Sequence, residues 1–148
     1  DKNDTPFTSS ITLIIALNES LKMMRADGLE YIFARHKKMA DAVRAAAKAL
    51  GLELFAPTAA SAAVTAVKVP AGLDGEKLVK TMRDTYGVTI AGGQDELKGK
   101  VFRIAHMGFI SEFDIITGLS CLEKVFTQMG YKFTLGAGIK AAEEVFLK

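Results

Sequence analysis

Arg103 is the side chain with the clearest chemical potential in this sequence. It stands in the apolar stretch 101–106, between Phe102 and Ile104. Alternation along an expected strand places those two neighbours on one face and Arg103 on the other. Its planar guanidinium suits a carboxylate, which it can hold through two parallel hydrogen bonds. The residues alone leave three interpretations open: binding of a substrate carboxylate, an ion pair with a neighbouring helix, or simple exposure to solvent.

Two short stretches offer hydroxyl or backbone groups to a ligand. Thr8, Ser9 and Ser10 precede an expected helix, so their hydroxyls and the free N–H groups of its first turn could hold a phosphate. Capping of that helix by the same hydroxyls is the alternative. The pair Gly92–Gly93 could let the backbone approach a ligand closely, and a turn is the alternative there.

The remaining reactive side chains favour structural roles. His36 lies on the apolar face of an expected helix, His106 ends the strand that carries Arg103, and Cys121 falls inside an apolar helical stretch. A single cysteine cannot build a disulfide framework, a zinc finger or an iron–sulfur cluster within one chain. The sequence has no HExxH, GxSxG, P-loop or CxxC motif. We therefore assign no catalytic residue and no metal ligand to this chain.

Composition limits the class of protein. The chain has 148 residues, of which 49% are hydrophobic and 24% charged, and this suits one folded domain or part of a larger one. Its 19 basic and 17 acidic residues give a net charge of +2, and no basic run predicts a nucleic-acid partner. The longest apolar run, Leu13 to Leu17, is too short for a bilayer. We expect a cytoplasmic protein, and the first residue, Asp1, suggests a processed chain or the tail of a longer one.

Apolar spacing and turn residues predict the elements that must position these groups. Helices are expected over 10–27, 29–50, 74–86, 112–129 and 139–147, and strands over 52–55, 64–69, 88–91 and 101–106. This order predicts an α+β fold with a small mixed sheet covered by helices. We expect residues 1–27 to form a lead-in and a connecting helix towards another domain, and residues 28–148 to form the domain itself.

Three longer stretches together resemble a known family. They are TPFTSSITLIIALNESLKMM at 5–24, GLEYIFARHKKMADAVRAAAKALGLELF at 28–55 and VTIAGGQDELKGKVFRIAHMGFISEFDI at 88–115. They resemble the C-terminal part of the class V aminotransferases, which are pyridoxal-phosphate enzymes of fold type I. The branch that looks most similar holds serine/alanine–glyoxylate (or –pyruvate) aminotransferases and cyanobacterial proteins called soluble hydrogenase small subunit. The pattern AGGQ-x-x-LKGK-x-FRI-x-HMG is its most specific part.

The resemblance implies a small C-terminal domain and a transamination between a small amino acid, serine or alanine, and glyoxylate or pyruvate. A complete member is roughly twice this length or more. It carries the lysine that forms the Schiff base with pyridoxal 5′-phosphate, and the aspartate that pairs with the pyridine nitrogen, in a large domain that would precede Asp1. The chain alone is therefore expected to be inactive, and a homodimer is expected for the complete enzyme.

Two site residues follow from the resemblance alone. Arg103, in FRIAHMG, matches the arginine that binds the substrate carboxylate, and Thr8, in PFTSS, matches a threonine that reaches the cofactor phosphate of the neighbouring subunit. The family usually has proline after that threonine and an aromatic residue three positions before it, where this chain has Ser9 and Thr5. The glycine of the family's RIGHMG is Ala105 here.

Other functions stay open on the sequence alone. Cysteine desulfurases share the fold type but need a mobile catalytic cysteine, and Cys121 lies in the middle of an expected helix. A hydrogenase, as some relatives are called, needs several cysteine ligands for its metal cluster. A binding or dimerisation module without catalysis is the third alternative. The exposed apolar face that this would leave on helix 10–27 argues against it.

Overall fold

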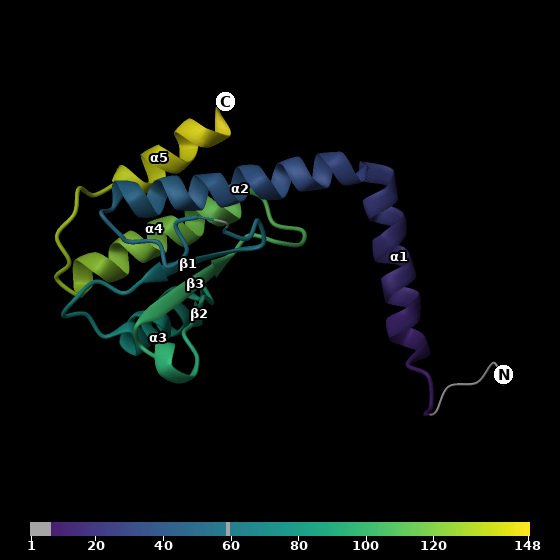
Figure 1. The fold of residues 1–148 in the computed structure, drawn as a ribbon, viewed down its shortest axis with the longest axis horizontal. Coiled ribbons are helices and arrows are strands. Elements are labelled where there is room, and N and C mark those ends of the chain that lie inside the picture. The colour runs from purple at the N-terminus through teal and green to yellow at the C-terminus, as the bar shows by residue number, and fades with distance from the viewer. Residues whose placement is uncertain (1–6, 59) are drawn as a thin grey trace. The chain divides into compact units, whose positions relative to one another are not determined.

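The computed structural model describes residues 7–58 and 60–148 (Figure 1). The described part of the chain forms two compact units, which divide between Arg35 and His36. The helices and strands of the described residues are, in chain order, α1 (Ile11–Asp27), α2 (Leu29–Ala49), β1 (Val64–Lys68), α3 (Gly75–Tyr86), β2 (Ala91–Gly92), the 3-10 turn Asp95–Leu97, β3 (Val101–Ala105), α4 (Glu112–Gln128) and α5 (Ala137–Phe146).

Helix α1 confirms the helix expected over 10–27, and its surface is unusual. Ile14, Leu17, Leu21 and Met24 recur at spacings of three and four, which places them on one face of the helix. None of the residues of α1 is buried, and Ile14 and Leu17 are each 58% exposed. The helix ends at Gly28, whose φ of 85° lies in the left-handed region that favours glycine.

The second unit is built on a three-stranded sheet of order β1-β3-β2. The α+β class is confirmed, but both pairings are antiparallel, whereas a mixed sheet was expected. The physical reason is the position of β3. Strands β1 and β2 are linked through helix α3 and run in the same direction, and β3 lies between them, so the two parallel strands never pair.

Two expected strands are much shorter than their apolar stretches. The stretch 52–55 forms a single bridge, from Leu54 to Val67. The stretch 88–91 pairs only at its end, because β2 begins at Ala91. Leu52, Leu54 and Ile90 are nevertheless buried in the core. Their apolar character therefore reflects burial in the core more than strand pairing.

One face of the sheet packs against helices. Val67 of β1 and Phe102 of β3 are fully buried, in a cluster with Leu78 of α3 and Phe126 of α4. A second cluster joins the later part of α2 to α4 and α5, and Figure 1 shows these three helices stacked beside the sheet. Each large side chain buried in this way contributes about 1.5–3 kcal/mol. The sheet is thus fixed from its helix-covered side, which leaves the side chains of its other face available.

Polar caps fix the ends of two of these helices. Ser111 caps α4, as expected, and exchanges hydrogen bonds with Asp114 in a capping box. These hydrogen bonds from Ser111 lower the pKa of the Asp114 carboxyl. The buried Glu123 carboxylate accepts hydrogen bonds from the backbone N–H groups of Gly136 and Gly138, at 2.5 and 3.0 Å, and so holds the start of α5. Among the described helices, none is long and apolar enough to cross a bilayer.

Candidate functional site

Arg103 lies at the centre of the sheet, on the face away from the helices. Phe102 and Ile104 pack in the helix-side clusters, so alternation along β3 turns the half-buried Arg103 to the opposite face. Its direct partners across the sheet are Ala66 on β1 and Ala91 on β2. Because both partners end at a methyl group, neither covers the guanidinium, which stays accessible from this face.

A backbone carbonyl holds one edge of the guanidinium. Nε and Nη2 of Arg103 both donate to the carbonyl oxygen of Gly92, at 3.1 and 2.9 Å. No carboxylate of the described residues lies within ion-pair distance of this guanidinium. The other N–H groups, on Nη1 and the outer side of Nη2, remain as donors. The arrangement presents a fixed cation that has the geometry to bind a carboxylate and lacks one of its own.

The tight loop after β2 determines the position of the Gly92 carbonyl. A Cβ on Gly93 would lie 2.0 Å from the carbonyl oxygen of Leu97, which is far inside contact distance. Gly93 also donates its N–H to the carbonyl of Val101, at 2.7 Å. Asp95 has a φ of 46°, the only described residue other than glycine with a positive φ. The pattern AGGQ-x-x-LKGK therefore encodes a tight loop that returns the chain to β3 and positions the carbonyl beside Arg103.

Thr8 lies in the first unit, and its side chain is exposed just before α1. Ser10 takes the N-cap position of α1 but makes no capping hydrogen bond through its side chain. The capping alternative for this hydroxyl is therefore not observed. The expected contact of Thr8 with a phosphate of the neighbouring subunit stays a prediction.

The two histidines differ sharply in environment. His36 is partly exposed, and its Nε2 lies 3.4 Å from the carbonyl oxygen of Gly108. His106 is fully buried and hydrogen-bonded through both ring nitrogens, to Ala62 and Thr65. Burial is the main cause that lowers the pKa of His106, and the Ala62 carbonyl partly opposes it. The sequence marked His106 as a strand end, but its two partners come from a loop and a strand some forty residues earlier.

The part of the chain that the structure describes has no cluster of three or more His, Cys, Asp or Glu side chains that could hold a metal ion. Cys121 is a free, partly buried thiol within α4.

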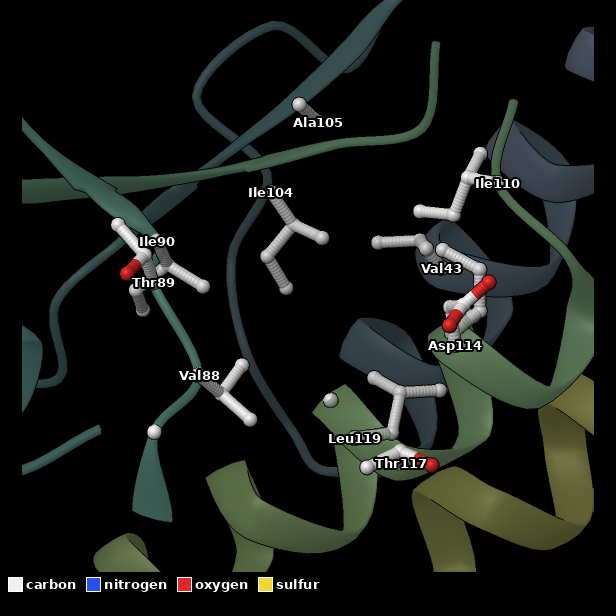
Figure 2. A pocket seen from close by; sticks show the side chains of 13 residues that line it. Val43, Val88, Thr89, Ile90, Ile104, Ala105, Ile110, Asp114, Thr117 and Leu119 are labelled. Carbon is white, nitrogen blue, oxygen red and sulfur yellow. The ribbon is translucent and has the colours of Figure 1, made fainter. Parts of the chain in front are cut away.

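A cavity of about 320 Å³ lies on the helix side of the sheet (Figure 2). Figure 2 shows the side chains of Val43, Ile104 and Ile110 directed into it. Ile104 follows Arg103 on β3, so its side chain points to the opposite face. This largely aliphatic cavity is therefore separate from the sheet face that carries Arg103.

Similarity to known proteins agrees with this geometry. No family model matches the chain. The chain is 47% identical over 146 residues to a soluble hydrogenase small subunit from Synechococcus. The aligned residues make up 97% of this chain and 38% of that protein. The chain is 39% identical to an L-aspartate–glyoxylate aminotransferase of Paracoccus denitrificans (97% of this chain, 37% of the relative) and 38% identical to a serine–glyoxylate aminotransferase of Hyphomicrobium methylovorum (100% and 37%).

A solved structure extends the similarity to the backbone. The crystal structure of pyridoxamine–pyruvate aminotransferase from Mesorhizobium loti superposes on this chain with a TM-score of 0.91, at 36% identity, over 98% of this chain and 38% of that one. This chain is similar to the C-terminal part of class V aminotransferases. It spans a little over a third of the length of the curated relatives that it matches. The resemblance and the fold expected from the sequence are thus confirmed.

The sequence indicates Arg103 as a candidate binding residue, but it does not indicate the atoms that orient the guanidinium. Arg103 stands out because a charged residue interrupts an apolar strand pattern. The Gly92 carbonyl and the Thr65 hydroxyl had no comparable signal. A backbone carbonyl is common to all residues, and a threonine in a strand is ordinary. The Gly92–Gly93 pair was the available clue, since glycine marks places where the chain turns tightly.

Proposed function

We propose that this chain is the C-terminal part of a class V aminotransferase that depends on pyridoxal 5′-phosphate. The complete enzyme transfers an amino group between a small amino acid, serine or alanine, and glyoxylate or pyruvate. The observation that carries the proposal is the Arg103 guanidinium, which is fixed at the Gly92 carbonyl and has no described carboxylate partner. The names of the aminotransferase relatives support the reaction class but differ in the amino donor.

Arg103 contributes by orientation. The amino acid and the 2-oxo acid both carry a carboxylate beside the reacting carbon, so a single arginine binds the substrate and the product of each half-reaction. Two parallel hydrogen bonds fix the plane of that carboxylate and hence the direction of the α-hydrogen. Pyridoxal phosphate, when bound, withdraws electrons from the α-carbon. Correct orientation of the α-carbon lowers the barrier because it removes unproductive poses.

Thr8 supplies the second contact of this chain, to the phosphate of the cofactor. The residues fit this role, because the Thr8 side chain is exposed and precedes a helix whose N-cap side chain makes no capping hydrogen bond. In the proposed enzyme the phosphate belongs to the neighbouring subunit, so the active form is a homodimer. The lysine that acts on the α-hydrogen comes from the large domain, and this chain alone is inactive.

The name of the Synechococcus relative gives a second candidate, a role beside a hydrogenase. Relatives called aminotransferases match the same stretch of this chain at 38–39% identity. The Arg103 geometry suits a carboxylate substrate, and the described residues contain no group of three or more His, Cys, Asp or Glu side chains that could hold a metal ion. We therefore place transamination first.

An assay of the protein encoded by the complete gene tests the proposal. The purified protein is supplied with pyridoxal phosphate, ¹⁵N-labelled serine or alanine, and glyoxylate, and glycine is detected by mass spectrometry. We expect labelled glycine, formed with pyruvate from alanine or hydroxypyruvate from serine. Pyruvate then replaces glyoxylate as acceptor, with labelled serine as donor and labelled alanine as the expected product. Absence of label transfer with every pair, from a protein that is folded, would contradict the proposal and favour a binding or dimerisation module.

A further inference from the structure

The hydrogen bonds of His106 define its protonation state. Nδ1 lies 2.8 Å from the carbonyl oxygen of Ala62, and Nε2 lies 2.9 Å from the hydroxyl oxygen of Thr65. A carbonyl oxygen only accepts, so Nδ1 must carry a proton. In the neutral ring Nε2 is then an acceptor, and the Thr65 hydroxyl donates to it. All polar atoms of this fully buried imidazole are thereby satisfied.

These hydrogen bonds close the end of the strand pair that carries Arg103. His106 follows β3 directly, and its backbone N–H donates to the carbonyl of Ala63 at 3.0 Å, one step beyond the paired residues. Thr65 lies opposite Ile104 and next to Ala66, the residue directly opposite Arg103. The ring thus connects β1 and β3 on the helix side, while the Arg103 side chain leaves the same strand pair on the other side.

Strand β3 depends on β1 for its position more than on β2. Five residue pairs join β3 to β1, but only two join β3 to β2. The pairing of β3 with β1 sets the position of the Arg103 main chain, and from there the side chain reaches the Gly92 carbonyl on β2. A change at the end of that strand pair therefore shifts the guanidinium relative to Gly92, and orientation is what a bidentate contact requires.

We propose that His106 and Thr65 act as positioning residues, whose hydrogen bonds hold β3 so that Arg103 presents its guanidinium correctly to a substrate carboxylate. This inference rests on the proposed function, because it assumes that Arg103 binds the carboxylate. Neither residue touches the substrate. Their effect passes through the main chain of β3 to the affinity for both the amino acid and the 2-oxo acid.

The surroundings of the ring fit this role. The described charged and titratable groups that act on His106 all come from α2: Arg44 and His36 oppose a charge on the ring, and Asp41 favours one. Arg44 also donates to the carbonyl of Ser61 at 2.5 Å, which ties the loop before β1 to α2. The neutral ring and Arg44 therefore hold neighbouring points of the same loop.

Substitution of Thr65 in the complete enzyme tests the proposal without changing the size of a buried side chain. Thr65→Val removes the hydroxyl and leaves Nε2 without a donor. We expect KM for the amino acid and for the 2-oxo acid to rise about tenfold, with a smaller fall in kcat. Thr65→Ser restores the hydroxyl and should restore both KM values. Thr127→Val is the matched control, because it also removes one hydroxyl hydrogen bond, to Glu123 in α4, far from β3 in the chain.

A double-mutant cycle separates positioning from general destabilisation. In an Arg103→Ala background the guanidinium is absent, so Thr65→Val should change KM by only about twofold or less. An equal rise in KM with and without Arg103 would overturn the proposal, as would an unchanged KM in a folded Thr65→Val enzyme. If Arg103→Ala itself left both KM values normal, the carboxylate role in the proposed function would fail as well. The two failures are therefore distinguishable.

Discussion

Among the residues that the structure describes, no acidic side chain lies within ion-pair distance of the Arg103 guanidinium. The guanidinium is half-buried on a sheet face, between the two methyl side chains of Ala66 and Ala91, and a backbone carbonyl binds one of its edges. A carbonyl is neutral, so it orients the guanidinium but leaves the positive charge uncompensated. A bound carboxylate can therefore still pair with this charge, and that pairing favours binding. An arginine held in this way is therefore better suited to bind a carboxylate ligand than an ion-paired arginine would be.

His106 should make the stability of the protein depend on pH. Its pKa in the folded chain lies below the ordinary value of 6.5, chiefly because of burial. Between that lowered pKa and 6.5 the unfolded chain binds more protons than the folded one, so stability is complete above 6.5 and falls as the pH drops below it. The slope approaches but does not exceed about 1.4 kcal/mol per pH unit for one proton. Urea unfolding between pH 7.5 and 5 measures this slope of the free energy of unfolding.

The other histidine provides the control for this prediction. His36→Ala should keep most of the pH dependence, because burial is the main cause of the lowered His106 pKa and His36 is a lesser one. His106→Asn keeps a donor near the Ala62 carbonyl and has no group that titrates in this range. We expect the slope below pH 6.5 to decrease in this variant. An undiminished slope would show that other groups cause the acid sensitivity.

Among the elements, the loop between β2 and β3 connects sequence pattern to site geometry most directly. Gly93→Ala would place a methyl group 2.0 Å from the Leu97 carbonyl oxygen, so the backbone of the loop must shift. We expect the free energy of unfolding to fall by about 1–3 kcal/mol, as in other overpacked sites. Chemical denaturation followed by circular dichroism suits this chain, which has no tryptophan.

The neighbouring glycine is a matched control for the loop. A Cβ on Gly92 would lie 3.8 Å from a methyl carbon of Val79, which is an ordinary contact. Gly92→Ala should therefore change stability by only about 0.5 kcal/mol. Equal losses for the two variants would mean that glycine is required at both places for its backbone freedom and not for the space beside Leu97.

The elements also show which sequence signals were sufficient. All five helices were predicted within a few residues of their observed bounds, because apolar spacing of three and four repeats over several turns. The strand candidates at 52–55 and 88–91 were overextended, since a short apolar run reports burial and not pairing. The mixed sheet was expected from the order of elements, which does not reveal that β3 lies between two parallel strands.

At the scale of the whole molecule, the chain divides into two units, and the expected boundary at residue 27 stays a prediction. No residue of α1 is buried, so α1 makes little contribution to the core of this chain. We therefore expect a chain that begins at Gly28 to unfold at the same urea concentration as residues 1–148. Circular dichroism at 222 nm measures both chains.

The outcome of that truncation also bears on the apolar face of α1. If the shortened chain unfolds at a clearly lower urea concentration, then α1 contributes packing to residues 28–148, and the boundary is wrong. We expect that protein outside this chain covers the same face in the proposed enzyme. The 148-residue chain should then show concentration-dependent association, which the truncation removes. Analytical ultracentrifugation of both chains tests this.

The most direct test of the proposed role of Arg103 is the kcat/KM of Arg103→Ala in the complete enzyme. Loss of two charge-assisted hydrogen bonds to the substrate carboxylate should lower kcat/KM by about a hundredfold or more for both the amino acid and the 2-oxo acid. Arg83→Ala is the control, because Arg83 is an exposed arginine on α3 that pairs with Asp84. We expect a large loss for Arg103→Ala alone. A near-normal kcat/KM in a folded Arg103→Ala enzyme would contradict the proposed binding of the substrate carboxylate by Arg103.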